Sequence, residues 1–291
     1  MKVGFVGLGA MGLPMARNLR TAGLLAAVWN RSSEKAASAA EELGVAAPAT
    51  LAALAAGVDA VMICVSADED VLEVISGLAS SLTPGALVID CSTVSSETAH
   101  NAAHTLQAQS VAFLDCPVSG GVEGARQGTL VVMAGGDRKA FDRAQPILQA
   151  IGKTVTWFGE AGAGQAAKAT NQIMCAGIIQ AVSEAMAFAR AQELPLDLLV
   201  DTLGKGAASS WYFVHRAPNM IRGTYPAGFR VRLHAKDLEI CRAMAARFGV
   251  SLPVVERMLG EYAELIERGY GDEDISADFR LKAELFDTRR T

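Results

Sequence analysis

Cysteine and histidine are scarce in this sequence, and neither is arranged as a metal site or a redox motif. The five cysteines are scattered in apolar surroundings without a Cys-x-x-Cys pair, so reduced thiols in the core of a cytoplasmic protein are expected. The four histidines form no His-Glu-x-x-His motif. His100 and His104 could share one helix face, but no third ligand stands nearby, so a solvated face is expected and no metal is predicted.

Basic blocks and long apolar runs are also missing. The net charge is −5, which argues against nucleic acid as a main partner. No apolar run reaches about 18 residues without polar interruption, and a strand-like run begins at once, so neither a membrane span nor a signal peptide is expected. The chain has 291 residues, 51% of them hydrophobic, which suffices for a large core and suggests two domains.

A glycine-rich turn follows the first strand-like run, KVGFVG at 2–7. Gly7-Leu8-Gly9-Ala10-Met11-Gly12 leads into a helical stretch that ends before Gly23. A strand, Gly-x-Gly-x-x-Gly and a helix in this order indicate dinucleotide binding; a plain glycine turn is the alternative. Gly7 would permit the tight turn, Gly9 would let the backbone approach a pyrophosphate, and Gly12 would let the helix pack closely.

The second expected strand, residues 25–30, lacks a terminal acidic residue. An NAD-binding protein carries Asp or Glu near this point to hold the ribose hydroxyls. Asn30-Arg31-Ser32 stands there instead. No carboxylate would repel a 2′-phosphate and Arg31 could pair with one, so a preference for NADP is predicted, with NAD possible. The alternative is that Arg31 is a surface charge beside a helix cap at Ser32 or Ser33.

Apolar runs of strand length alternate with helical segments through the first half. The runs lie at 60–65, 86–91, 111–115, 129–134 and 154–158. This alternation predicts a parallel sheet with helices on both faces. Val65, Ser66 and Thr93 follow strand ends, where ligands bind in open α/β sheets, although Ser92, Thr93, Ser95 and Ser96 can also cap a helix.

A loop of small residues, Ser119-Gly120-Gly121, precedes another helical segment. Such a loop exposes amide N–H groups that can hold a carboxylate. The alternative is a simple turn.

Residues 163–192 contain no proline and read as one long helix. From 163 to 189 only Lys168 and Glu184 are charged, so a buried helix is expected. Burial and the helix dipole would both lower the pKa of Lys168, which suits a proton donor and acceptor. The equally weighted alternative is a lysine that extends to the surface. Further helices are expected at 195–203, 210–221, 233–248, 253–267 and 275–285.

Four motifs, at 4–19, 115–130, 162–172 and 234–238, resemble the β-hydroxyacid dehydrogenases. This is the family of 3-hydroxyisobutyrate dehydrogenase, tartronate semialdehyde reductase and the glyoxylate/succinic semialdehyde reductases. The resemblance implies an α/β Rossmann domain at 1–162, a long interdomain helix at 163–192, and an all-α domain through 291 for substrate and oligomerisation. It also implies a homodimer or homotetramer, and reversible hydride transfer between a nicotinamide cofactor and a short acid.

The resemblance further implies roles for single residues. Lys168 matches the family's catalytic lysine. Substrate contacts fall on Ser119, Gly120, Gly121, Asn171, Gln172, Phe229 and Asp237, and cofactor contacts on Thr93 and Lys236. Gln172 stands where many members carry Asn, and its longer arm makes the same hydrogen bonds, so the departure bears on substrate preference more than on activity.

These observations favour an NADP-preferring semialdehyde or glyoxylate reductase that acts on a small acid. An NAD-dependent dehydrogenase of the 3-hydroxyisobutyrate type is one alternative. A non-catalytic dinucleotide-binding module is another, although it has no need of Lys168 or of Ser119-Gly120-Gly121. Decarboxylation of the 6-phosphogluconate type is less expected, because the C-terminal half is short.

Overall fold

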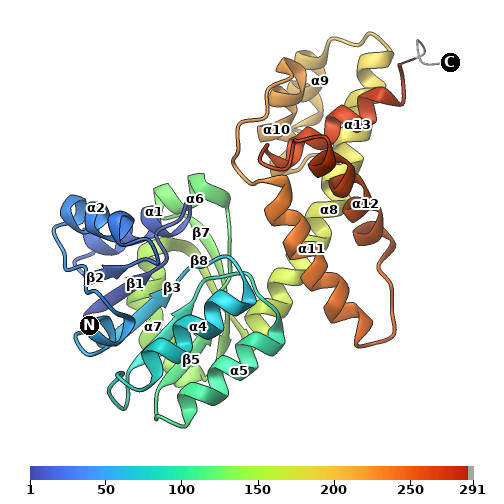
Figure 1. Cartoon of the computed structure of the whole chain (residues 1–291). Coiled ribbons are helices and arrows are strands. Elements are labelled where there is room, and N and C mark those ends of the chain that lie inside the picture. Colours follow the sequence, from blue (N-terminus) through green and yellow to red (C-terminus); the bar gives the residue numbers. More distant parts are fainter. Residues whose placement is uncertain (288–291) are drawn as a thin grey trace. The chain divides into compact units, whose positions relative to one another are not determined.

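The computed structural model describes residues 1–287. The chain forms two compact units, one from Met1 to Lys168 and one from Ala169 onward (Figure 1). The division falls inside the long helix α8 (Ala163–Ala191). The boundary expected from the sequence lies at the start of this helix, whereas the compact units divide after Lys168.

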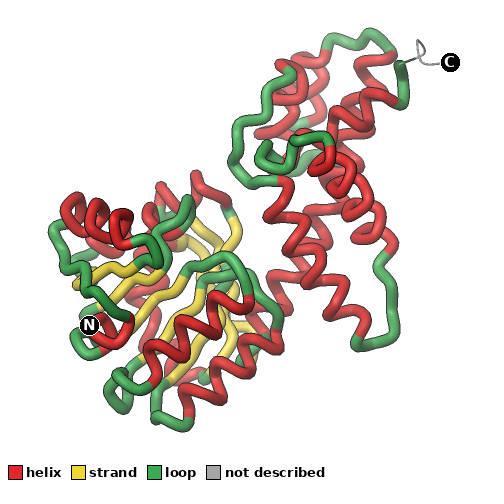
Figure 2. Tube along the Cα trace, in the orientation of Figure 1, coloured by secondary structure: helices red, strands yellow, loops and turns green. Residues whose placement is uncertain are grey.

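The first unit contains every strand of the described residues (Figure 2). The strands are β1 (Val3–Val6), β2 (Leu25–Trp29), β3 (Ala60–Ile63), β4 (Leu87–Asp90), β5 (Ala112–Asp115), β6 (Val118–Ser119), β7 (Leu130–Gly136) and β8 (Gly152–Gly159). Their order in the sheet is β2-β1-β3-β4-β5-β7-β6, with β8 paired to β7. β1 to β5 are parallel, which confirms a Rossmann-type unit.

Beyond β5 the sheet is mixed: β8 is parallel to β7, but the expectation of a parallel sheet is wrong for the two pairs that β7 forms with β5 and β6. β7 runs antiparallel to β5, and the short β6 runs antiparallel to β7. Gly120 and Gly121 both have positive φ at the end of β6, a conformation that glycine adopts without strain. They turn the chain into α6 (Gly121–Gln127), after which β7 returns in the opposite direction.

Helices cover both faces of this sheet, as the alternation predicts. Helices α1 (Gly12–Thr21), α2 (Ser33–Leu43), α6 and α7 (Arg138–Ile151) pack into one core, and α3 (Leu51–Ala55), α4 (Asp68–Ala79) and α5 (Ser96–Gln107) into another. Neighbouring strand residues alternate between the two cores: Phe5 belongs to the first and Val6 to the second. Because each face of the sheet is covered, both sets of strand residues are apolar, and the strands appear in the sequence as continuous apolar runs.

The second unit is helical (Figure 2). It contains most of α8, α9 (Leu196–Leu203), α10 (Trp211–Arg222), α11 (Val231–Ala246), α12 (Pro253–Glu267), the 3₁₀ turn η1 (Ile275–Asp278) and α13 (Phe279–Glu284). These elements surround one apolar core, in which Tyr262 and Phe279 are among the largest buried side chains. The helix expected over 275–285 is therefore divided into a 3₁₀ turn and a short α-helix.

The long helix α8 differs from expectation in two respects. By length and composition alone it could cross a membrane, a test that the core helix of a globular protein also passes. Only 39% of its most apolar window is buried. Met174 is 62% exposed and Phe188 53%, so the expectation of burial on all sides is wrong for the single chain.

Candidate functional site

The turn between β1 and α1 requires glycine at two positions and leaves a third open. A Cβ at Gly7, where φ is +95°, would lie 2.2 Å from the backbone oxygen of Cys64, and a Cβ at Gly12 would lie 1.9 Å from that of Gly7. A Cβ at Gly9 would meet nothing within 4 Å. Leu8 is buried, whereas Gly9 and Ala10 are exposed. Because Met11 supplies no side-chain cap, the start of α1 suits an anionic group.

Asn30 and Ser32 support the local fold at the end of β2. The Leu8 N–H donates to Asn30 Oδ1 at 3.0 Å, and Asn30 Nδ2 donates to the Ser32 backbone oxygen at 3.3 Å. Ser32 is the N-cap of α2, since its side chain accepts from the Lys35 N–H. Asn30 thus joins the glycine turn to the segment in which a dinucleotide-binding protein holds the adenosine ribose.

Arg31 is the exposed member of this segment. Its side chain is 79% exposed, and one guanidinium nitrogen, Nη1, lies 3.0 Å from Asp70 Oδ1 in the first turn of α4. Arg31 is thus a surface charge beside the Ser32 cap that also has an acidic partner on another element. Sequence reasoning missed Asp70; its only signal is its place in the acidic start of α4.

The carboxyl ends of β3 and β4 are joined through Ser92. Its hydroxyl accepts from the Val65 N–H at 2.9 Å, and its N–H donates to Asp90 Oδ1 at 2.9 Å. Ser95, not Ser92, is the N-cap of α5. Ser66 is exposed and Thr93 half-buried, so both lie at the edge where the strands end.

Two buried side chains bind the start of α8 to this edge. Asp115 accepts the N–H of Gly162 at its Oδ1 and the N–H of Gln165 at its Oδ2, both at 2.8 Å. Gln165 donates from Nε2 to the Ser92 backbone oxygen at 2.9 Å, and its Oε1 accepts the Val94 N–H at 3.2 Å. Sequence reasoning missed both residues.

Lys168 follows directly on the same helix. It is 7% exposed, so the alternative of a lysine that extends to the surface is wrong. Ser119, Gly120 and Gly121 lie at the junction of β6 and α6, with Gly120 exposed at the N-cap of α6. The first unit therefore holds the glycine turn, the Ser-Gly-Gly loop and Lys168.

The remaining expected residues lie in the second unit. Gln172 Nε2 donates to Asp237 Oδ2 at 2.6 Å, while Asp237 Oδ1 lies 3.0 Å from Lys236 Nζ. Asn171 Nδ2 donates to Gln172 Oε1 at 2.8 Å. Gln172 is 1% exposed and Asp237 4%, so the carboxylate that pairs with Lys236 is shielded from solvent. Phe229 packs at the edge of the helical core.

His234, which sequence reasoning missed as part of this group, is buried beside it. Its Nδ1 lies 2.8 Å from the Tyr262 hydroxyl and its Nε2 3.4 Å from the Gln172 backbone oxygen. Its ring centroid lies 5.4 Å from that of Phe229. His234 thus helps to hold the backbone of Gln172 and the ring of Phe229 in place.

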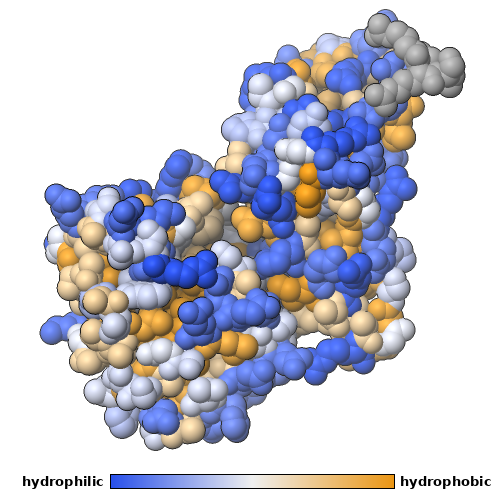
Figure 3. Space-filling view, in the orientation of Figure 1, coloured by the Kyte–Doolittle hydropathy of each residue, from blue (hydrophilic) through white to orange (hydrophobic). Residues whose placement is uncertain are grey.

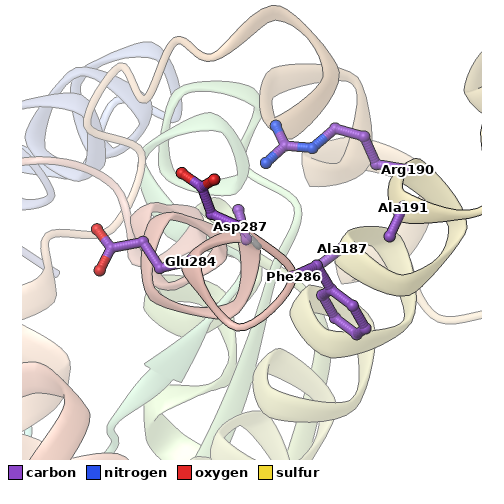
Figure 4. A pocket seen from close by; sticks show the side chains of 7 residues that line it. Ala187, Arg190, Ala191, Glu284, Phe286 and Asp287 are labelled. Carbon is purple, nitrogen blue, oxygen red and sulfur yellow. The ribbon is translucent and has the colours of Figure 1, made fainter. Parts of the chain in front are cut away.

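Other features of the described residues do not coincide with this site. No group of three or more His, Cys, Asp or Glu within residues 1–287 could hold a metal ion. A pocket of about 390 Å³ in the second unit lies between the end of α8 and the segment around α13, and none of the expected site residues lines it (Figure 4). Its lining mixes Arg190, Glu284 and Asp287 with Ala187, Ala191, Ala283 and Phe286.

Asp90 and Asp115 are paired in register at the ends of the adjacent strands β4 and β5. Burial raises the pKa of Asp90 to about 7 and that of Asp115 to about 6. Asp90 Oδ2 has no hydrogen-bond partner. A carboxyl group in this environment is costly to ionise, so the folded state holds its proton more tightly than the unfolded chain does.

Because of these two raised pKa values, we expect the protein to be more stable in mild acid than at neutral pH and above. An unfolded Asp has a pKa of about 3.9, so stability from these protons is complete below that value and is lost as the pH rises through about 6 to 7. Asp90→Asn should reduce the fall in Tm between about pH 5 and about pH 8. The exposed Asp197→Asn serves as the control. An unchanged pH dependence in Asp90→Asn would contradict this account.

Two family models match consecutive parts of the chain. Residues 2–159 match the NAD binding domain of 6-phosphogluconate dehydrogenase. Residues 162–281 match the domain described as NAD-binding of NADP-dependent 3-hydroxyisobutyrate dehydrogenase.

Characterised proteins are similar over nearly the whole chain. The 2-hydroxy-3-oxopropionate reductase of Escherichia coli K12 is 36% identical over 257 residues, 87% of each chain. The NAD-dependent L-serine dehydrogenase of Pseudomonas aeruginosa is 32% identical over 290 residues, 96% of this chain and 97% of the other. The crystal structure of 3-hydroxyisobutyrate dehydrogenase from Salmonella typhimurium is 35% identical with a TM-score of 0.84, covering 97% of this chain and 99% of that one.

Proposed function

Because the chain belongs to the β-hydroxyacid dehydrogenase family of NAD(P)-dependent oxidoreductases, we propose that it acts as a semialdehyde or glyoxylate reductase that prefers NADP(H). The observation that carries this proposal is the buried Lys168, on a helix whose first turn is hydrogen-bonded to the carboxyl edge of a dinucleotide-binding sheet. A non-catalytic module would have no use for a lysine in this place.

The residues of the β1–α1 turn fit a dinucleotide. Gly9 leaves space beside exposed backbone, while Gly7 and Gly12 bring the turn and the helix together, so a pyrophosphate could approach the N–H groups at the start of α1. The reduced nicotinamide supplies a hydride to the carbonyl carbon when it is bound.

The chain's own residues then supply the proton and the orientation. In reduction, Nζ of Lys168 gives a proton to the carbonyl oxygen as the C–H bond forms, and a hydroxyl results; in oxidation it takes the hydroxyl proton. N–H groups of Ser119-Gly120-Gly121 would hold the substrate carboxylate. In the second unit, Asp237 and Asn171 hold the Gln172 amide in one orientation.

The carboxylate contact can be tested with paired substrates. Succinic semialdehyde and butanal have the same carbon chain, but only the first carries a carboxylate. Hydrogen bonds to a charged group contribute about 1.5–3 kcal/mol, so kcat/KM should be about 10- to 100-fold higher for the semialdehyde. Equal values for the two aldehydes would argue against an acid as the substrate.

The proposed preference for NADP depends on Arg31. Asp70 engages Nη1, and a guanidinium offers five N–H donors, so others can meet a 2′-phosphate. Arg31→Ala should raise the KM for NADPH about 10- to 100-fold and change the KM for NADH little. Arg17→Ala, which removes an exposed arginine paired with Glu42, is the control. Equal effects on both cofactors would refute the role of Arg31.

NAD-dependent oxidation of a hydroxyacid is the second candidate. The carboxylate of Asp70 beside Arg31 favours it, because an acidic group at this place would repel a 2′-phosphate. The same pair of cofactor titrations separates the two candidates: a lower KM for NAD than for NADP would favour the second.

We also propose that the protein forms a homo-oligomer. Large apolar side chains of the second unit are exposed in the single chain, among them Met174, Phe188, Leu198 and Phe248, and apolar areas interrupt its polar surface (Figure 3). A second copy would cover such a surface. Light scattering should give a mass of two or four chains; the mass of a single chain at micromolar concentration would contradict this proposal.

A further inference from the structure

Side-chain hydrogen bonds tie the first turn of α8 to the sheet. The first N–H groups of a helix have no acceptors within the helix. Here the acceptor is Asp115, at the end of β5, whose two oxygens take the N–H groups of Gly162 and Gln165. Asp115 is fully buried, so water does not compete for these bonds.

Gln165 fastens the same turn to the neighbouring strand end. Its amide bonds both the Ser92 oxygen and the Val94 N–H, and so holds the two ends of the short loop that carries Thr93. Its side chain is 1% exposed. Both the donor and the acceptor of the amide are used, which fixes its orientation as well as its position.

The approach of helix and sheet leaves no room for adjustment. A Cβ at Gly164 would lie 2.4 Å from the Asp115 backbone oxygen and 2.5 Å from that of Met133. A Cβ at Gly135 would lie 2.6 Å from Asp115 Oδ1. The backbones of α8 and of the strand ends are therefore in close contact here, and the helix cannot move nearer to the sheet.

Lys168 stands three positions after Gln165, on the same side of the helix. The compact first unit ends at Lys168. We propose that Asp115 and Gln165 are positioning residues that fix Lys168 within the dinucleotide-binding unit. Gln172, one turn further on, belongs to the second unit. The inference rests on the proposed role of Lys168 as proton donor and adds the residues that set its place.

Gln165→Met keeps the size of the side chain and removes both amide hydrogen bonds. Asp115→Asn keeps the acceptor for one N–H group and sets an NH₂ group against the other. A displacement of about 1 Å can cost about 100-fold in rate, so each variant should lower kcat about 10- to 100-fold. The KM for NADPH should change less than kcat does, because the β1–α1 turn is untouched.

Matched controls separate positioning from a general loss of stability. Asp137→Asn makes the same change at the N-cap of α7, in the same unit, and Gln149→Met alters an exposed glutamine. Both should keep the kcat of the wild-type protein. Hydrogen exchange of the amides at 162–168, measured without substrate, should accelerate in Gln165→Met and Asp115→Asn and not in the controls.

The outcomes also distinguish this inference from the proposed function. If Lys168→Ala is inactive while both positioning variants keep kcat within about twofold, the inference is overturned and the function stands. A fall in kcat that merely follows a fall in Tm, with unchanged exchange at 162–168, would also overturn it. Loss of kcat with faster local exchange and unchanged NADPH binding would support it. A wild-type protein that oxidises no NADPH would refute the proposed function. The positioning of Lys168 by Asp115 and Gln165 would then be tested by hydrogen exchange at 162–168, and unchanged exchange in both variants would overturn it.

Discussion

Lys168→Ala is expected to lower kcat about 10²- to 10⁴-fold, the usual contribution of a general acid or base. The side chain is buried, and its helix is hydrogen-bonded to the edge at which β4 and β5 end. Removal of the ammonium group would leave the developing alkoxide without its proton. The affinity for NADPH should change little, because the β1–α1 turn is untouched.

Steady-state kinetics and fluorescence titration with NADPH would measure the two quantities separately. Lys139→Ala, which removes an exposed lysine at the start of α7, is the matched control and should keep the wild-type kcat. A Lys168→Ala protein with nearly normal kcat would exclude this lysine as the proton donor. Weaker NADPH binding in step with the loss of kcat would place the lysine in cofactor binding instead.

Gly9→Ala is expected to weaken NADPH binding by tenfold or more, about 1.4 kcal/mol, without lowering Tm. The added methyl group would meet no atom of the chain, so the fold has no reason to change. The methyl group would project into the space through which a pyrophosphate approaches the backbone. Isothermal titration with NADPH and a thermal melt test the two halves of this prediction.

Gly12→Ala is the contrasting variant. Its Cβ would lie 1.9 Å from the Gly7 backbone oxygen, so α1 must move away from the turn, and Tm should fall. The two glycines of one motif therefore have different roles: Gly9 leaves space for the ligand, and Gly12 allows the helix to pack against the turn. If Gly9→Ala bound NADPH normally, the pyrophosphate would have to lie elsewhere.

The sequence predicts the parts of the fold that depend on local pattern. Apolar runs bounded by turns predict the positions of β1 to β5, because strands buried on both faces of a sheet are continuously apolar. The long α8 is predicted by a stretch without proline and with few charges. The reversal at β6 was not predictable in this way. A strand of two residues has no periodicity, and the positive φ of Gly120 and Gly121 is a property of the folded turn.

In the candidate site, too, some residues can be recognised from local sequence and others only from the fold. Lys168 and the glycine turn stand out in the sequence through a lone charge on an apolar helix and a spaced motif. The paired contacts of the site do not stand out in the sequence, because each joins two residues far apart in the chain: Arg31 with Asp70, and Gln172 with Asp237. Such pairs arise only when the strands and helices have been placed.

The proposed function is the transfer of a hydride from NADPH to a short oxo-acid. The most direct measurement follows the near-ultraviolet absorbance of NADPH with glyoxylate, succinic semialdehyde, tartronate semialdehyde and methylmalonate semialdehyde in turn. Rapid loss of NADPH is expected with one of them, matched by one hydroxyacid formed per NADPH consumed. Tight binding of NADPH with no consumption by any of the four would contradict it.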